Sequence, residues 1–337
     1  MQNWQLLAAK KKKLRPFLIK EELIKAVRAF FYQRDFHEII TPTLNSSLPL
    51  ETNIYAFETN WQTLSRTKKF YLATSPESAL KKSLAAGIDN CFTIAKSFRN
   101  LENSGEEHNP EFLMLEWYRA DANYQQIMQD TEKLIVFVKK WIDSFLKHIY
   151  QQQEIEIQPP WPRLSLEKLF NKHANLDFIA ILDETLFREQ ASDRGYEVAK
   201  ASWGEIFDQI FLNEIESKLP KQALFLTDFP AKISPLCKVQ KEKPYLAERF
   251  ELFIAGMEIA NGNSEETDAR KVKKAFDLEL KFRKENAISS HPYDRDFLQA
   301  LSLLKGRNYA GIGLGIDRLA MIMADVSDIK DTNLFSF

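Results

Sequence analysis

Residues 96–118 bring together side chains that could bind an anionic ligand with a flat ring. The segment KSFRNLENSGEEHNPEFLMLEWY has two apolar runs separated by a polar loop with a glycine and an Asn-Pro pair, which predicts two strands joined by a loop. Its polar side chains are Arg99, Glu102, His108, Asn109, Glu111, Glu116 and Tyr118. Polar groups beside buried strand residues need partners, so their density favours a ligand-binding site. In such a site the guanidinium would bind phosphate, Phe112 would stack on the ring and the carboxylates would bind an amine. A charged surface hairpin is the alternative.

Residues 245–266, YLAERFELFIAGMEIANGNSEE, contain a second group of candidate side chains. Because side chains alternate between the faces of a strand, Glu251 and Glu258 could lie side by side on two strands joined by a turn at Gly256. Adjacent carboxylates repel each other unless a cation lies between them, and magnesium that bridges nucleotide phosphates fits that position. The alternative is a pair of exposed edge carboxylates with an ordinary hairpin turn at residues 261–263.

The segment YAGIGLGIDRLAMIM, which begins at Tyr309, is a third candidate. Three glycines alternate along its predicted strand and clear one face for a ligand, namely Gly311, Gly313 and Gly315. A helix is predicted from Ile316, and Arg318 projects from its first turn. Glycines before a helix are weak evidence alone. The guanidinium strengthens the case, because it can bind phosphate and stack on rings.

Helical and strand periodicities predict the elements that would position these side chains. Helices are predicted over residues 17–31, 78–86, 124–146 and 267–286, and strands over residues 36–40, 91–98 and 224–229. The first helix and the strand that stops at Pro42 either pack on the chain's own sheet or pair two subunits.

Residues 74–77, Thr-Ser-Pro-Glu, have a complete structural explanation as the start of a helix. Ser75 can cap the helix, Pro76 suits its first position and Glu77 suits its positive end. A carboxylate at such a position that faces a pocket could also bind a substrate ammonium.

The composition limits the classes of function. The 337 residues are 45% hydrophobic, enough for a substantial core, and the 46 Lys and Arg balance the 47 Asp and Glu, so no overall field attracts a polyanion. Cys91 and Cys237 have no paired spacing, which disfavours a zinc site or disulfide framework and suits a reducing cytoplasm. No apolar run reaches the roughly 18 residues of a membrane helix, so we expect no membrane partner.

The chain divides into a short tail and one large domain. Residues 1–15 predict a basic tail that is a solvated flexible end, with contact to an acidic partner as the alternative. Residues 16–337 predict the catalytic domain, in which the polar, Pro-rich stretch 151–162 is the clearest linker. Residues 163–220 predict an accessory helical insertion.

Together these segments resemble the three motifs of class II aminoacyl-tRNA synthetases, in the lysyl branch. The Pro42 segment is similar to motif 1, FRNLENSGEEHNPEF to motif 2 and GIGLGIDRL to motif 3, with TSPE, MLEWY and ERFELFIAGMEIANG between them in the expected order. The resemblance covers essentially the whole chain. It implies an α+β fold in which helices flank an antiparallel sheet, and a homodimer.

Lysyl-tRNA synthetases carry an anticodon-binding barrel before this domain, whereas only a short tail precedes the first helix here. We therefore expect no anticodon-binding domain and no tRNA substrate. The chain most resembles the shortened paralogues, the elongation factor P–(R)-β-lysine ligases. This resemblance implies that ATP and (R)-β-lysine or lysine form an aminoacyl-adenylate, and that the acyl group passes to a lysine side chain of elongation factor P. A stand-alone tRNA-charging enzyme and a non-catalytic paralogue are the alternatives.

The resemblance also implies roles for individual residues. Arg99 and Arg318 would be catalytic, and Mg²⁺ would bind Glu251 and Glu258. Arg99 would contact the α-phosphate, His108 would face the γ-phosphate, and Phe112 and Arg318 would sandwich the adenine. The implied ATP-binding residues are Arg99, Asn100, Glu102, His108, Asn109, Phe112, Glu258, Ile259, Gly315 and Arg318. The implied residues around the amino acid are Ser75, Pro76, Glu77, Glu116, Tyr118, Asn261, Glu265 and Gly313, with Glu77 at the amino group near the carboxylate and Glu116, Tyr118 and Glu265 at the terminal ammonium.

The sequence departs from the family pattern at several positions. Glu102 follows Arg99 by three residues where lysyl-tRNA synthetases have two, and Glu106 and Glu107 stand where relatives often have Arg. Two positions in the expected amino-acid pocket also differ, because Asn263 replaces the usual Phe and Gly313 replaces the Ala common in the ligases. These differences leave the choice between β-lysine and lysine open.

Overall fold

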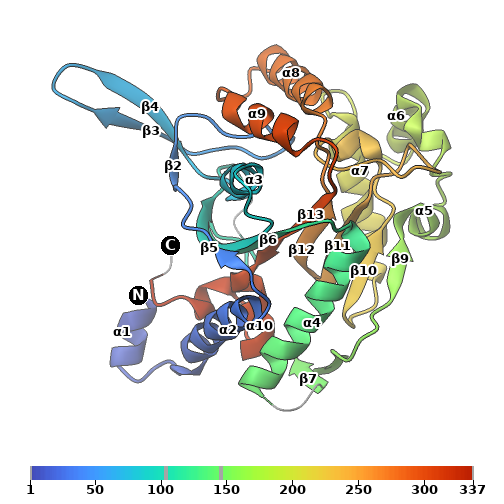
Figure 1. The fold of residues 1–337 in the computed structure, drawn as a ribbon. Helices are drawn as coiled ribbons and strands as arrows, with labels where there is room; N and C mark the ends of the chain where they lie inside the picture. Colours follow the sequence, from blue (N-terminus) through green and yellow to red (C-terminus); the bar gives the residue numbers. More distant parts are fainter. Residues whose placement is uncertain (1, 102–104, 144–146, 336–337) are drawn as a thin grey trace.

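The computed structural model describes residues 2–101, 105–143 and 147–335, and within them a sheet of eight strands forms the centre of the molecule (Figure 1). In spatial order the strands are β1 (His37–Glu38), β5 (Asn90–Phe98), β6 (Glu111–Ala120), β13 (Tyr309–Gly315), β12 (Met257–Ser264), β11 (Arg249–Ile254), β10 (Leu224–Thr227) and β9 (Arg163–Ser165). The outermost pairs, β1 with β5 and β9 with β10, are parallel, and the other neighbours are antiparallel. The predicted α+β class is confirmed.

Three helices cover one face of this sheet, α2 (Arg15–Tyr32), α4 (Tyr124–Ile142) and α10 (Ile316–Ala324). Alternate strand residues point toward these helices, and Phe92, Trp117 and Ile312 belong to one buried cluster with them. Phe31 of α2 stacks on Phe92 with ring centroids 4.7 Å apart. The helical periodicity of residues 17–31 therefore reflects packing on the chain's own sheet.

Two separate groups of helices cover the ends of the opposite face (Figure 1). At the β5 end lie α3 (Glu77–Ala85), α8 (Ala269–Glu285) and α9 (Arg295–Leu304), which share a core with Cys91 and Tyr118. At the β9 end, residues 163–220, where an accessory helical insertion is predicted, begin with β9 of the main sheet. They continue with α5 (Leu166–Leu169), α6 (Glu184–Asp193), α7 (Trp203–Ile210) and the short 3₁₀ and π helices η1 (Phe170–Ala174), η2 (Ala180–Leu182), η3 (Phe211–Ile215) and η4 (Glu216–Lys218). The middle strands between these groups carry the candidate site.

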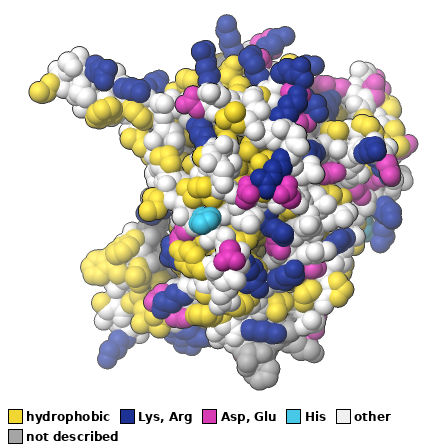
Figure 2. Space-filling model, viewed as in Figure 1, with side chains coloured by type: hydrophobic (Ala, Val, Ile, Leu, Met, Phe, Trp, Pro, Cys, Tyr) yellow, Lys and Arg dark blue, Asp and Glu magenta, His cyan; other side chains and the backbone are white. Residues whose placement is uncertain are grey.

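Two smaller sheets lie beside the main one. Strands β2 (Leu44–Asn45), β4 (Thr67–Leu72) and β3 (Glu58–Gln62) form one, and the β3–β4 hairpin projects from the body of the molecule (Figure 1). Figure 2 shows hydrophobic and basic side chains along this hairpin. Strands β7 (Lys147–Tyr150) and β8 (Gln153–Glu156) form the other.

The prediction of a linker at residues 151–162 is wrong. This stretch contains β8, and its apolar residues Ile155, Ile157 and Trp161 are buried in the same cluster as the main sheet. The Trp161 indole donates a hydrogen bond to the Ile157 carbonyl at 3.0 Å. Polar and proline residues dominated the sequence pattern, while three well-spaced apolar side chains determine the packing.

The prediction of a free basic tail is wrong for the described part of residues 1–15. Helix α1 (Asn3–Ala8) lies against the turn η6 (Ile329–Thr332), and the Asn3 amide donates hydrogen bonds of 2.6 Å to the carbonyls of Lys330 and Asn333. Lys12 forms an ion pair with Asp331. The basic run thus has a carboxylate partner close to the C-terminus.

No helix in the described ranges is long and apolar enough to cross a membrane.

Candidate active site

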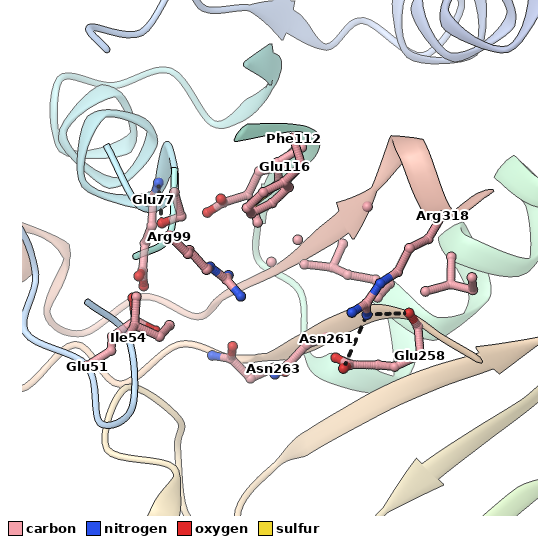
Figure 3. Close-up of a pocket in the computed structure, with 18 of the residues that line it drawn as sticks. Glu51, Ile54, Glu77, Arg99, Phe112, Glu116, Glu258, Asn261, Asn263 and Arg318 are labelled. Carbon is pink, nitrogen blue, oxygen red and sulfur yellow. Dashed lines mark hydrogen bonds and ion pairs between the residues drawn. The ribbon is translucent and has the colours of Figure 1, made fainter. Parts of the chain in front are cut away.

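A cavity of about 490 Å³ opens on the face of the sheet between the two helix groups. Most predicted site residues line it, namely Arg99, His108, Asn109, Phe112, Glu258, Ile259, Gly315 and Arg318 from the expected nucleotide site, and Ser75, Glu77, Glu116, Tyr118, Asn261 and Gly313 from the expected amino-acid site. Figure 3 shows Glu77 toward one end and Arg318 toward the other, with Arg99 and Glu116 between them. The three candidate segments, residues 96–118, 245–266 and the segment that begins at Tyr309, therefore meet in one cavity.

Arg99 enters the cavity directly after β5. Its backbone amide donates to the carbonyl of Pro110 at 3.1 Å, which closes the hairpin at the residue that follows the strand. Its guanidinium carbon lies 5.3 Å from the ring centroid of Phe112, within the range of a cation–π contact. The hairpin thus places a cation and an aromatic ring beside each other, which suits a nucleotide.

Arg318 projects from the first turn of α10 and ties three elements together. Its guanidinium donates to the carbonyl of Glu258 at 2.8 Å and to that of Glu107 at 3.2 Å, and it lies 3.7 Å from the Glu258 carboxylate (Figure 3). The third contact joins an Arg318 nitrogen to Nε2 of His108 at 2.7 Å. Because a guanidinium cannot accept a hydrogen bond, Nε2 of His108 is the acceptor.

Glu116 and Tyr118 occupy neighbouring positions on the cavity face of β6. Both are buried, and the Tyr118 hydroxyl donates to the Glu116 carboxylate at 2.5 Å. Burial raises the pKa of Glu116 well above its ordinary value, Glu77 raises it further, and the Tyr118 hydrogen bond offsets part of the rise. A buried carboxylate of this kind is stabilised by a cationic ligand.

Gly311 makes room for Tyr118. The two residues face each other across β13 and β6, and a Cβ atom at position 311 would lie 2.3 Å from the tyrosine ring. At Gly313, opposite Glu116, a Cβ atom would meet the Met114 sulfur at an ordinary 3.5 Å. The glycine pattern of this strand therefore has a steric cause at residue 311 that is absent at residue 313.

A buried lysine, Lys81, connects two of the predicted carboxylates. It pairs with Glu265 at 2.5 Å and with Glu77, one turn earlier on α3. Burial alone lowers the pKa of Lys81, but Glu265 and Glu77 raise it overall above the ordinary lysine value. Glu77 lines the cavity and Glu265 does not, so the structure places Glu265 behind the cavity wall.

The second candidate pair, Glu251 and Glu258, is not directly opposed. In the register of β11 and β12, Glu251 faces Asn261 and Glu258 faces Phe253, with a bulge between Leu252 and Phe253. Glu251 accepts a hydrogen bond of 2.8 Å from the Arg249 guanidinium and does not line the cavity, whereas Glu258 does. Burial and the nearby Glu258 raise the pKa of Glu251 to about 8.

The alternative of a turn at residues 261–263 is wrong, because these residues lie inside β12. A Cβ atom at Gly262 would lie 2.6 Å from the Phe250 ring and 2.9 Å from the Gly311 carbonyl, so the glycine permits close strand packing.

The donor set does not form a closed metal site. Within residues 2–101, 105–143 and 147–335, no group of three or more His, Cys, Asp or Glu side chains could hold a metal ion. Magnesium at nucleotide phosphates commonly uses only one or two protein carboxylates, so Glu258 fits such an ion and Glu251 fits less directly.

Other predicted residues lie beside the cavity rather than in it. The amide of Asn100 donates to the Tyr55 carbonyl at 2.8 Å, and its side chain accepts from the Leu101 amide at 3.0 Å. Pro76 precedes the first residue of α3, and the Ser75 hydroxyl accepts from the Glu77 amide at 3.3 Å. Glu102 lies outside the described residues.

The sequence patterns missed the loop between β2 and β3, which lines the cavity. Glu51, Thr52 and Ile54 lie on the wall, and the buried Arg283 of α8 holds their loop by donating to the carbonyls of Glu51 at 2.5 Å and Ile54 at 3.0 Å. Residues 51–73 predict short aromatic strands but no site residue, and the anchor of this loop is more than 200 residues away in the chain. Residues 233–237, Arg249 and Asn263 also line the cavity.

Comparison with known proteins shows the family of the chain. The family model described as tRNA synthetases class II (D, K and N) matches residues 2–337. Among curated relatives, the lysine–tRNA ligase of Carboxydothermus hydrogenoformans is 36% identical over 323 residues, that of Pelotomaculum thermopropionicum 37% over 323, and that of Buchnera aphidicola subsp. Cinara cedri 36% over 332. These alignments cover 95–98% of this chain and 62–64% of each relative. The chain belongs to the class II tRNA synthetases of the D, K and N group.

Proposed function

We propose that this protein is an AMP-forming ligase that uses ATP to activate a lysine-type diamino acid as an aminoacyl-adenylate. The observation that carries the proposal is the single cavity in which Arg99, Phe112 and Arg318 share a wall with the carboxylates of Glu77 and Glu116. Cationic and aromatic groups suit a nucleotide, and buried carboxylates suit two ammonium groups.

In the proposed reaction, a carboxylate oxygen of the amino acid forms a bond to the α-phosphorus of ATP, and the bond to the leaving pyrophosphate breaks. Negative charge builds on the phosphate oxygens, and Arg99 would stabilise it at the α-phosphate with His108 toward the γ-phosphate. Phe112 and Arg318 would hold the adenine, and the Gly315 backbone would border the nucleotide. Magnesium, held by Glu258 with Glu251 behind it, would supply further charge neutralisation.

The amino acid would bind across the carboxylates. Glu116 and the Tyr118 hydroxyl would contact the terminal ammonium, with Asn261 nearby, and Glu77 would contact the ammonium closer to the reacting carboxylate. The roles proposed for Glu265 and Pro76 would act through Lys81 and through the start of α3, because neither residue lines the cavity. Holding both reactants in one cavity would supply much of the rate enhancement by proximity.

For the acceptor, we propose a lysine side chain of elongation factor P and (R)-β-lysine or lysine as the acyl group. The support is the motif resemblance, together with the acidic Glu106 and Glu107 in the loop beside the cavity. Both are exposed, and Glu107 lines the cavity. Acidic side chains there would repel the phosphates of a tRNA end.

A homodimer belongs to the same proposal. Large hydrophobic side chains at the end of α2 and in the segment around Pro42 are exposed, namely Tyr32, Ile40 and Leu44. Such a patch is what a subunit interface would cover.

A second candidate, charging of tRNA with lysine, is favoured by the relatives, which are lysine–tRNA ligases. One experiment separates the two. Purified protein is assayed for pyrophosphate exchange into ATP with L-lysine or (R)-β-lysine, and then for transfer to elongation factor P and to lysine tRNA. Exchange followed by labelling of elongation factor P supports the first proposal, and charging of tRNA supports the second. No exchange with either amino acid would indicate a non-catalytic paralogue.

A further inference from the structure

Glu51 reaches the cavity from a segment to which the family motifs assign no role. It lies in the loop between β2 and β3, lines the cavity, and occupies the same end as Glu77 in Figure 3. The fully buried Arg283 holds the Glu51 carbonyl, and a pairing between Leu48 and Tyr293 fixes the chain just before it. The position of Glu51 is therefore set by packing against the α8–α9 region.

The Glu51 carboxylate is not neutralised inside the protein. Within the described residues, no group donates a hydrogen bond or forms an ion pair with it. Burial and the nearby Glu77 together raise the pKa of Glu51 to about 7, although Arg99 and Lys81 oppose the rise. A cation beside Glu51 would relieve both the burial penalty and the repulsion from Glu77.

Lys81 holds Glu265 away from the cavity, so Glu265 is not available to a cation there. The lysine bonds both Glu265 and Glu77, and Glu265 does not line the cavity. Of the carboxylates in this region, Glu51, Glu77 and Glu116 face the cavity. An incoming diamino acid therefore meets three carboxylates from three different segments of the chain.

We propose that Glu51, together with Glu77, binds the ammonium group nearest the reacting carboxylate, while Glu116 and Tyr118 bind the terminal ammonium. This inference rests on the proposed function and adds a specificity-determining residue to it. Arg99 is close enough to Glu51 to influence its charge and is the residue proposed at the α-phosphate. An ammonium at Glu51 would therefore lie beside the carboxylate that attacks the phosphorus.

Three ligands that differ only in their amino groups test the assignment. L-Lysine carries both ammonium groups, 6-aminohexanoate carries only the terminal one, and L-norleucine carries only the one near the carboxylate. Dissociation constants are measured by calorimetry for the full chain and for Glu51→Gln. The substitution should raise the dissociation constants of L-lysine and L-norleucine by roughly 10- to 100-fold and leave that of 6-aminohexanoate unchanged.

Two further variants make the result specific. Glu58→Gln is the matched control, because Glu58 is a nearby glutamate on β3 that pairs with Lys69 at 2.8 Å outside the cavity, and it should change none of the three constants. Glu51→Asp keeps the charge and should retain part of the affinity for L-lysine that Glu51→Gln loses. It also reports on the site if the glutamine variant fails to fold.

The outcomes separate this inference from the proposed function. The inference is overturned if Glu51→Gln weakens the binding of all three ligands equally. It is also overturned if the substitution weakens the binding of none of them while the unchanged protein binds L-lysine, because Glu51 then does not bind the nearer ammonium. If the unchanged protein binds neither these three ligands nor (R)-β-lysine, the proposed function itself fails, and with it the substrate assumed here.

Discussion

The two ends of the cavity are built differently. At the nucleotide end, Arg318 is held by the backbone carbonyls of Glu107 and Glu258 and by Nε2 of His108, and it lies 3.7 Å from the Glu258 carboxylate. At the amino-acid end, Glu116 is buried in the sheet and Glu51 and Glu77 lie nearby, and burial raises the pKa of Glu116 and Glu51. One end offers cations for a nucleotide, and the other holds buried carboxylates that a cationic ligand would stabilise.

The two ends should therefore gain binding energy from different sources. Backbone carbonyls keep the Arg318 guanidinium oriented for stacking on an adenine, and Arg99 offers the charge-assisted bond to an arriving phosphate. The buried carboxylates carry a desolvation penalty in the free protein, and a diamino acid removes that penalty on binding. Loss of a cation should therefore affect the chemical step most, and loss of a carboxylate should affect amino-acid affinity most.

The largest expected effect is at Arg99. Arg99→Ala should lower the rate of amino-acid-dependent pyrophosphate exchange by about 10²-fold or more, because it removes the charge proposed to stabilise the α-phosphate in the transition state. The unfolding transition should stay within a few degrees of the parent, as followed by circular dichroism. Arg28→Ala, on the exposed side of α2, is the control. Exchange at the parental rate would remove Arg99 from the phosphate site.

At the carboxylate end, a substitution should change amino-acid affinity more than the rate of the chemical step. Glu116→Gln should raise the KM for the diamino acid by roughly 10- to 100-fold and change the KM for ATP little, because the lost group contacts an ammonium. The neutral glutamine should also preserve stability, since burial already favours the protonated form of Glu116. A parallel increase in both KM values would show that the two ends do not bind separate ligands.

A steric pair gives a smaller effect. Gly311→Ala should lower the free energy of unfolding by about 1–3 kcal/mol, because the new Cβ atom would lie 2.3 Å from the Tyr118 ring. The same substitution should also weaken binding of the diamino acid. Gly313→Ala, two residues along the same strand, meets Met114 at 3.5 Å and should be nearly neutral. Urea titrations of both variants make the comparison, and equal losses would remove the proposed role of Gly311 in placing Tyr118.

The smallest effect is a pH dependence of stability. Glu51 and Glu265 have pKa values raised to about 7 in the folded protein, against an ordinary value of 4.5. The folded state therefore holds protons that the unfolded state has lost, so this contribution is complete below about pH 4.5 and is lost as the pH rises through about 7. Melting temperatures between pH 5 and 8 should fall less steeply for Glu51→Gln than for the parent. Identical slopes would show that Glu51 titrates normally.

The sequence predicted those parts of the molecule that follow from local pattern. The helical period of residues 17–31 and the two strands around motif 2 appear in the structure as α2, β5 and β6. Glu116 lines the cavity because strand alternation fixes the face to which its side chain points, and Arg99 lines it directly after the end of β5.

The remaining features depend on contacts between distant residues. Glu51 is placed by Arg283, and Glu265 is drawn behind the wall by Lys81, and neither pairing has a local signal in the sequence. The bulge between Leu252 and Phe253 likewise moves Glu258 out of register with Glu251, which simple alternation could not predict. The predictions of a free tail and of a linker are wrong because a few anchoring side chains, and not the polar composition of these segments, determine how they pack.

A crystal structure with the sulfamoyl analogue of lysyl-adenylate would show whether one cavity binds both ligands, because that compound joins them in one molecule. We expect its adenine between Phe112 and Arg318, its sulfamoyl group at Arg99, its terminal ammonium at Glu116 and Tyr118, and its other ammonium between Glu51 and Glu77. An analogue bound with its ammonium groups away from these carboxylates, or with its adenine away from Phe112, would contradict the account.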